Sequence, residues 1–176
     1  MIRIFDFLFS LIGLIFLSPL LILIFFIGLF DNGSPLFIQI RVGCNLKSFS
    51  LIKFRTMPKG VRSAGTHLIK DIQLSSFGYF LRRTKIDETL QLLNVFLGDM
   101  SLVGPRPCLF NQRKLISERK KRRVFKVRPG ITGLAAINGI DMKTPTLLAK
   151  TDQKMIKDMS LYKYFYYIFK TIFKII

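Results

Sequence analysis

The sequence is poor in the residues on which common catalytic and metal-binding sites depend. Its 176 residues include two cysteines, one histidine and no tryptophan. Cys44 and Cys108 lie far apart and form no CxxC or Cys/His group, which argues against a zinc site and against a disulfide framework. Because His67 is the one histidine, the sequence also argues against a Ser-His-Asp triad and against a histidine-based metal site.

Acidic residues are scarce as well: ten stand against 28 basic residues, and the formal net charge is +18. Half of the residues are nevertheless hydrophobic, and the mean hydropathy is +0.38. A protein that rests on anionic membrane lipids combines these properties, because the headgroups attract each nearby Lys or Arg by about 1 kcal/mol. Nucleic acid is the other partner that such a charge would suit. Composition alone leaves both partners open.

The longest uncharged segment, residues 7–30, has the length of a membrane helix. It is too long for a signal-peptide core and no cleavage pattern follows it, so we expect it to be retained. Ser18-Pro19 lies in its middle, where proline removes a backbone donor and kinks a helix. A spanning helix and a re-entrant helix that returns to the same leaflet both fit these residues. The excess of basic residues after the segment places the larger part of the chain in the cytoplasm.

The residues after this segment predict a β-hairpin. Lys53 and Arg55 fall on one face of its second strand, because side chains alternate with period two. This face is either simply solvated or a place where two cations act together. The parts of the hairpin are a turn at residues 31–35, strands at residues 37–42 and 48–55, and a connection at Gly43-Cys44-Asn45.

Three later segments suit a membrane surface. Residues 74–85 and 161–176 combine aromatic faces with basic residues, which is typical of interfacial helices and also of helices that face a protein core. Residues 111–128 are strongly basic, with Arg119–Arg123 at the centre. This run is either a solvated helix face or a patch that binds headgroups. Residues 58–72 show no periodicity and indicate a loop.

One stretch, residues 84–107, carries a pattern that suggests chemistry. Asp87 and Glu88 are adjacent acids in a strongly cationic chain. Thr84-x-x-Asp87 has the form of a capping box, which predicts that Asp87 lies in the first turn of a helix, where an ionised carboxylate is favoured. The turn Gly104-Pro105-Arg106-Pro107 presents Arg106, whose planar fork suits phosphate. An ordinary helix start is the plain alternative.

Taken together, the motifs resemble those of the bacterial sugar transferases, the small monotopic phosphoglycosyl transferases that begin polysaccharide and glycoconjugate assembly. The resemblance extends from Ile2 to Thr171, and its motifs are specific through their number and order. They are Ser18-Pro19, residues 33–43, Lys53-Phe54-Arg55-Thr56-Met57, Asp87-Glu88, Leu92-Leu93-Asn94-Val95, residues 98–107 and residues 128–135.

The resemblance implies an α+β fold that is mostly helical, with a small β-hairpin and interfacial amphipathic helices around the active site. Residues 1–30 would form a re-entrant membrane helix broken at Ser18-Pro19. Residues 31–176 would form a catalytic domain at the cytoplasmic face of the bacterial inner membrane, which makes the protein monotopic.

The implied reaction moves a sugar 1-phosphate from a UDP-sugar to polyprenol (undecaprenyl) phosphate and releases UMP. By resemblance, Asp87 is the nucleophile of a ping-pong mechanism and Glu88 assists the acceptor. Mg²⁺ is the implied cofactor, with Asp87 as its ligand. Lys53, Arg82 and Arg106 would bind the substrate phosphates.

The implied partners are the two substrates and anionic membrane lipids, with later glycosyltransferases as candidates and no nucleic acid. A non-catalytic basic protein that binds membranes or nucleic acid is the alternative, and it gives no reason for the Asp87-Glu88 pair. The donor sugar is not predicted. Three departures from the family pattern bear on the site: Thr89-Leu90 replaces Leu-Pro, Ala136 replaces Gln, and Ile140 replaces Arg.

Overall fold

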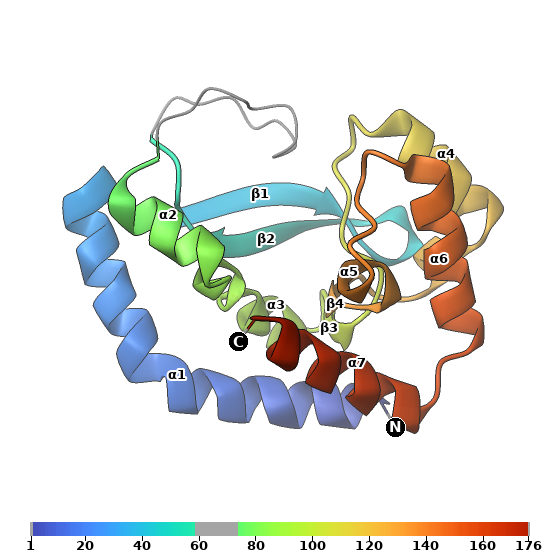
Figure 1. The fold of residues 1–176 in the computed structure, drawn as a ribbon, viewed down its shortest axis with the longest axis horizontal. Coiled ribbons are helices and arrows are strands. Elements are labelled where there is room, and N and C mark those ends of the chain that lie inside the picture. Colours follow the sequence, from blue (N-terminus) through green and yellow to red (C-terminus); the bar gives the residue numbers. More distant parts are fainter. Residues whose placement is uncertain (1, 59–73, 176) are drawn as a thin grey trace.

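The computed structural model describes residues 2–58 and 74–175 (Figure 1). It confirms the predicted α+β class, with helices predominating over two small sheets. The predicted loop at residues 58–72 lies outside the described residues, apart from Pro58. The helices are α1 Ile2–Asn32, α2 Ser76–Arg83, α3 Gln91–Leu97, α4 Arg113–Lys121, α5 Leu134–Ile137, α6 Pro145–Lys157 and α7 Leu161–Ile175, with 3₁₀ turns η1 Cys44–Leu46, η3 Ile86–Glu88 and η4 Val124–Lys126. The strands are β1 Leu36–Val42, β2 Ser48–Phe54, β3 Ser101–Val103 and β4 Gly130–Thr132.

Helix α1 continues through Pro19 and is bent near its middle, as Figure 1 shows. By length and composition it could cross a membrane. Pro19 has no N–H to donate to the carbonyl of Ile15, four residues earlier. The hydroxyl of Ser18 donates to that carbonyl instead, at 2.8 Å. The side chain before the proline therefore satisfies the carbonyl that the proline leaves free, which an apolar environment requires.

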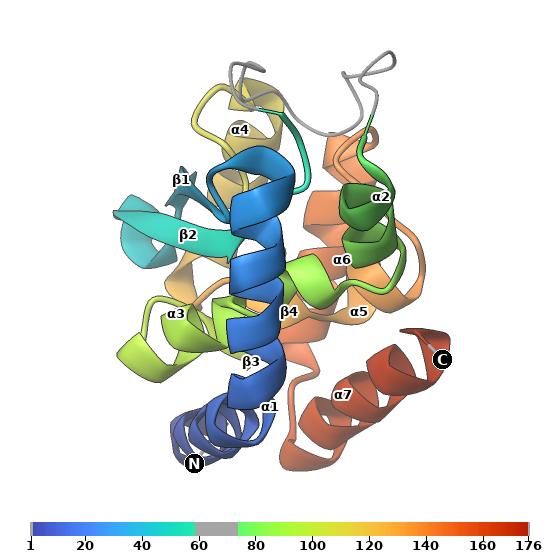
Figure 2. The same cartoon turned by 90° about the vertical axis from the view of Figure 1, so that its left-hand side faces the viewer.

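The first half of α1 is attached to the rest of the fold by a buried carboxylate. Asp6 is 2% exposed. It accepts hydrogen bonds from the hydroxyl of Ser101 at 3.0 Å, the N–H of Leu102 at 2.9 Å and the hydroxyl of Tyr164 at 2.9 Å. Arg3 donates to two carbonyls in the last turn of α3. Polar contacts thus join α1 to α3, β3 and α7, which lie close to its first half in both views (Figures 1 and 2).

The hairpin is antiparallel and runs in register from Leu36 opposite Phe54 to Val42 opposite Ser48, which confirms the predicted strands. Asn94 of α3 fixes the second strand from the side. Its amide oxygen accepts from the N–H of Ile52 at 3.0 Å, and its nitrogen donates to the carbonyl of Ser50 at 2.8 Å. Helix α3 therefore holds a fixed position beneath β2.

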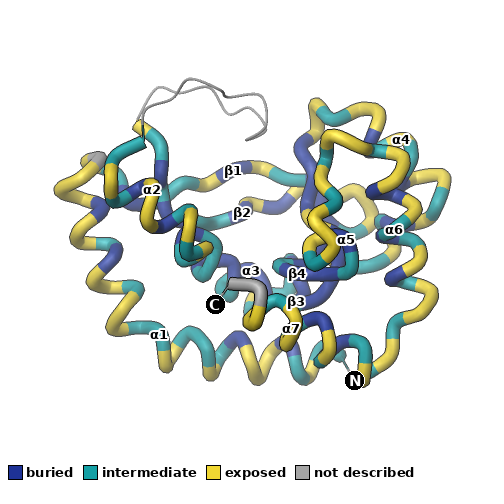
Figure 3. The backbone as a smooth tube through the Cα atoms, viewed as in Figure 1, coloured by how far each residue is buried: buried dark blue, intermediate teal, exposed yellow. Residues whose placement is uncertain are grey.

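The last helix, α7, has one core face and one exposed aromatic face. Tyr164 and Tyr167 are buried, whereas Tyr162, Phe169 and Phe173 are exposed. Figure 3 shows exposed residues, in yellow, along both α1 and α7. The core role predicted for this segment is therefore confirmed for one face, and the interfacial role of the exposed aromatic face stays a prediction.

Candidate active site

The acid pair lies in the short 3₁₀ turn η3, between α2 and α3. The predicted capping box is wrong. Thr84 ends α2 instead, and its hydroxyl donates to the carbonyls of Phe80 and Leu81. Lys85 then takes a left-handed conformation, with φ of 60°, and turns the chain sharply into the acid pair. The position of Asp87 therefore follows from this turn and not from the start of a long helix.

Asp87 is an isolated carboxylate in a buried position. It is 4% exposed and makes no hydrogen bond or ion pair with any residue that the structure describes. Burial, followed by the negative charge of Glu88, raises the pKa of Asp87 to about 6. The charges of Lys53, Lys85 and Arg82 act in the opposite direction. At neutral pH Asp87 is thus largely ionised and has free lone pairs.

Glu88 has the opposite surroundings, although it is the next residue. Arg106 forms an ion pair with it through two nitrogens, of which Nη1 lies 3.4 Å from Oε2. Burial disfavours the charged form of Glu88, but the charge and hydrogen bonds of Arg106 outweigh burial, and the pKa of Glu88 falls below its usual range. Glu88 therefore remains an anion that is held in place.

The three predicted phosphate-binding cations surround this pair. Lys53 on β2 is half-buried, and burial lowers its pKa while the charges of Asp87 and Glu88 counteract this effect. Arg82 in the last turn of α2 is close enough to affect the pKa of Asp87, and Arg106 reaches Glu88 directly. The structure thus brings together every residue of the predicted site, and their functions remain predictions.

The Arg106 turn lies at the junction of β3 and β4, which are paired in parallel. Glycine is required here, because a Cβ on Gly130 would lie 2.0 Å from the backbone nitrogen of Gly104. The backbones of the two Pro/Gly-rich motifs, residues 104–107 and 128–133, are therefore in direct contact. Arg128, from the second motif, donates to the carbonyl of Gly98 at 2.7 Å.

Two arginines near this turn were not predicted as part of the site. Arg41 of β1 donates to the carbonyl of Pro107 at 3.2 Å, and its pKa is lowered to about 10 by burial and then by the charge of Arg106. Arg119 of α4 is 1% exposed, so the predicted basic run at Arg119–Arg123 does not form a single solvated or headgroup-binding face. Period-two alternation in β1 could have drawn attention to Arg41. Nothing local in the sequence marks Arg119 as buried.

The acid pair fits a magnesium ion only in an open arrangement. Among the described residues, no group of three His, Cys, Asp or Glu side chains could hold a metal. Glu88 is engaged by Arg106, which leaves the carboxylate of Asp87 as the available ligand. Mg²⁺ commonly takes one or two carboxylates together with water and substrate phosphates. The predicted role of Asp87 as metal ligand is compatible with this donor set.

The departures from the family pattern lie in two different surroundings. Thr89 donates from its hydroxyl to the carbonyl of Ile86 at 2.7 Å, a contact that stabilises η3 where a proline is missing. Ile140 packs against an apolar cluster that contains Leu148 and Ala149, and Ala136 in α5 is exposed. Position 140 therefore supplies packing here and no charge.

These features define a class of site. An ionised carboxylate that pairs with none of the described residues and lies beside several cations suits a reaction of an anionic substrate, and the apolar helix α1 suggests membrane association. The bacterial sugar transferase family model matches residues 1–176. The chain belongs to the bacterial sugar transferase family, as the motifs indicated.

Several relatives cover most of the chain. It is 37% identical over 98% of its length to UDP-glucose:undecaprenyl-phosphate glucose-1-phosphate transferase of Klebsiella pneumoniae. It is 34% identical over 97% of its length to exopolysaccharide production protein ExoY of Rhizobium meliloti, of which the match covers 83%. It is 49% identical over 108 residues, 61% of its length, to uncharacterized sugar transferase EpsL of Bacillus subtilis. The match covers 53% of EpsL and 39% of the Klebsiella protein.

Proposed function

We propose that the protein transfers a sugar 1-phosphate from a UDP-sugar to undecaprenyl phosphate and releases UMP. The single observation that carries the proposal is the isolated, buried carboxylate of Asp87 among Lys53, Arg82 and Arg106. The Klebsiella relative is named for a reaction of this kind. A protein that merely binds membranes or nucleic acid through positive charge has no use for a buried anion, whose desolvation is unfavourable.

In the first step, an oxygen of Asp87 attacks the phosphorus that carries the sugar. A carboxylate–phosphorus bond forms as the bond between the two phosphates breaks, and UMP leaves with the bridging oxygen. Lys53 and Arg82 are two of the three cations whose charges act on Asp87, so they are placed to neutralise the donor's diphosphate. Magnesium, when held by Asp87, would add positive charge at the phosphate oxygens.

In the second step, a phosphate oxygen of undecaprenyl phosphate attacks the same phosphorus. The bond to Asp87 breaks, the carboxylate is regenerated, and the product is a sugar joined to the lipid through a diphosphate. A covalent intermediate separates the two substrates, which are both anions and repel each other. Asp87 suits both steps because it is ionised at neutral pH and bound to no other described residue.

Glu88 serves best as an orienting group in this scheme. Its lowered pKa makes it a weak proton acceptor, whereas its ion pair fixes Arg106 next to Asp87. Arg106 would then meet the phosphate of the incoming acceptor. Glu88→Gln should therefore retain one rapid equivalent of UMP released per enzyme but slow the turnover that follows, by about 10- to 100-fold. A complete loss of the first equivalent would assign Glu88 to the first step instead.

We also propose that α1 is re-entrant and that the remaining residues lie at the cytoplasmic face of the inner membrane, in contact with anionic lipids. The bend near Pro19 and the polar contacts of Asp6 with β3 and α7 support this arrangement, because they hold the start of α1 against the domain that follows it. The alternative, a spanning helix, would require the start of α1 to leave these contacts.

The function is tested with purified protein, Mg²⁺, a panel of UDP-sugars and undecaprenyl phosphate. We expect UMP release with at least one donor, and we expect Asp87→Asn to abolish it while membrane binding persists. Asp158→Asn, an exposed acid at the end of α6, is the matched control and should retain full activity. Turnover that persists in Asp87→Asn would contradict the proposed nucleophile, and a wild-type protein inactive with every donor would contradict the function.

A further inference from the structure

The turn that carries Arg106 is held by an unusual series of backbone contacts. Four consecutive carbonyls, those of residues 105–108, each accept a hydrogen bond from a different donor group. The donors are Gly130 N–H to Pro105 at 2.9 Å, Arg119 Nη1 to Arg106 at 2.8 Å, Arg41 Nη1 to Pro107 at 3.2 Å and Val42 N–H to Cys108 at 2.9 Å.

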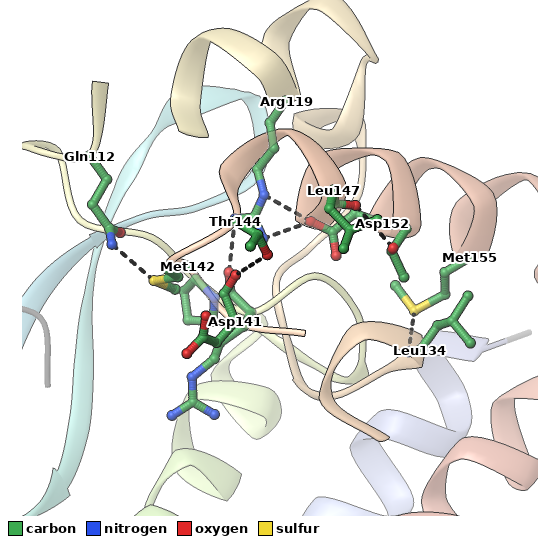
Figure 4. A network of polar contacts seen from close by, with 12 residues as sticks. Gln112, Arg119, Leu134, Asp141, Met142, Thr144, Leu147, Asp152 and Met155 are labelled. Carbon is green, nitrogen blue, oxygen red and sulfur yellow. Dashed lines mark hydrogen bonds and ion pairs between the residues drawn. The ribbon is translucent and has the colours of Figure 1, made fainter. Parts of the chain in front are cut away.

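Arg119 is the donor that acts on Arg106 itself. Its guanidinium lies between α4 and α6, where it pairs with Asp152 (Figure 4). The two side chains are 2% and 1% exposed. Nε and Nη2 of Arg119 lie 2.9 and 2.7 Å from one oxygen of Asp152, and Nη1 points to the carbonyl of Arg106. One planar group therefore joins a buried acid to the backbone of the residue that contacts Glu88.

Stability alone does not explain this ion pair. Transferring two charges from water into the protein interior is unfavourable, and well-packed apolar residues of similar size are often equally stable or more so. The arrangement has a clear geometric consequence, because Pro105 and Pro107 limit the backbone on both sides of Arg106. With its carbonyl fixed as well, Arg106 projects its side chain in one direction, toward Glu88.

We propose that Arg119, with Asp152 as its counterion, is a positioning residue that holds Arg106 within reach of Glu88 through the Arg106 carbonyl. This inference rests on the proposed function in that it assigns Arg119 a part in the same site. Arginine is required because its fork can bond to a carboxylate and a carbonyl at once, whereas lysine is a point charge.

The chain offers a direct test, because Glu88 and Glu118 are its only two glutamates. Labelling glutamate with ¹³C at the carboxyl carbon gives two signals, and Glu118→Gln assigns them. Each glutamate pairs with an arginine, Glu88 with Arg106 and Glu118 with Arg122. A titration followed by NMR therefore reports the ion pair of Glu88 without any need for activity.

We expect Arg119→Lys to raise the pKa of Glu88 by about half a unit or more and to leave that of Glu118 unchanged. Arg122→Lys, the same exchange at the residue that caps the end of α4, is the matched control and should affect Glu118 alone. In an Arg106→Ala background, Arg119→Lys should have no further effect on Glu88, since it acts through Arg106. A folded Arg119→Lys protein with an unchanged Glu88 titration would overturn the inference.

Two further measurements keep the test decisive. If Arg119→Lys does not fold, Arg119→Gln/Asp152→Asn removes both buried charges together and should show the same shift. In the UMP assay, Arg119→Lys should lower kcat/KM by about 10- to 100-fold, and this loss should disappear in the Arg106→Ala background. If the losses in kcat/KM caused by Arg119→Lys and Arg106→Ala add up in the double variant, the inference is overturned. An inactive wild type would contradict the proposed function, and the titration of Glu88 would still decide on Arg119.

Discussion

Asp87 and Glu88 are neighbours in the chain, yet the structure gives them opposite ionisation behaviour. Burial raises the pKa of Asp87, and Arg106 lowers that of Glu88 despite its burial. Adjacent titratable groups whose surroundings move their pKa values apart are typical of active sites, where each group has a separate task. Here the separation gives one carboxylate with no bonding partner among residues 2–58 and 74–175, and one that is fixed by an arginine.

The fall in the rate of UMP release at acidic pH, the acid limb of the pH profile, should reflect the protonation of Asp87. Attack requires the ionised form, so the initial rate of UMP release should fall as the pH drops through about 6. Lys53 lowers the pKa of Asp87, so Lys53→Met should raise it and move the acid limb to higher pH. Lys47→Met, an exposed lysine of the same hairpin, should leave the limb in place. If the acid limb of Lys53→Met stays at the wild-type pH, Lys53 does not affect the ionisation of Asp87.

Asp87→Asn should stabilise the protein while it abolishes activity. The pKa of Asp87 is about 6 in the folded state against an ordinary value of 3.8, so folding disfavours its ionised form. This destabilisation is absent below about pH 4, grows as the pH rises to 6 and then stays constant. We expect a gain of about 1–2 kcal/mol at pH 8 and little at pH 4, measured by thermal unfolding at both values. Equal melting temperatures at pH 8 would contradict the raised pKa.

The hairpin was predictable from the sequence because its signals are local. Alternation and a Gly-Cys-Asn connection identified both strands, and the register confirms them. The capping box at Thr84 failed because the same hydroxyl can bond backward to Phe80 and Leu81, which ends one helix instead of starting another. Local pattern does not distinguish these two uses of a threonine.

Contacts between distant residues account for what could not be predicted. Arg119 lies in a basic run and looks solvent-exposed in the sequence, but its partner Asp152 is 33 residues away. Asp6 precedes the apolar segment, and its hydroxyl donor Tyr164 is 158 residues away. The family motifs identified Lys53, Arg82 and Arg106 as neighbours of the acid pair. Arg41 and Arg119 instead bond to backbone carbonyls of the turn that carries Arg106.

The contact between Asp6 and Tyr164 should stabilise the fold measurably. Tyr164→Phe removes one of three hydrogen bonds to a buried carboxylate and should lower the free energy of unfolding by about 1–3 kcal/mol, because the bond is to a charged group. Denaturant titration in mild detergent measures this change. Tyr162→Phe is the control, since Tyr162 is 79% exposed on the same helix. Equal effects of the two substitutions would show that Asp6 does not depend on Tyr164.

The topology of α1 depends on which side of the membrane its first residues occupy. A re-entrant helix places Ile4 on the same side as α6, whereas a spanning helix places them on opposite sides. Ile4 is 62% exposed, and Lys150 is exposed on α6. In a Cys44→Ser background, we expect Ile4→Cys and Lys150→Cys to react with a membrane-impermeant maleimide in inside-out vesicles, and neither to react in spheroplasts.

The bend near Pro19 would supply the physical cause of the proposed re-entrant topology. Ser18→Ala/Pro19→Ala restores the N–H that the carbonyl of Ile15 lacks and removes the hydroxyl that now serves it, so a straight helix becomes favourable. A straight helix of this length and apolarity can cross the bilayer. In this variant, Ile4→Cys should become reactive in spheroplasts while Lys150→Cys does not. Reactivity of Ile4→Cys in spheroplasts without the double substitution would establish a spanning helix and contradict the re-entrant one.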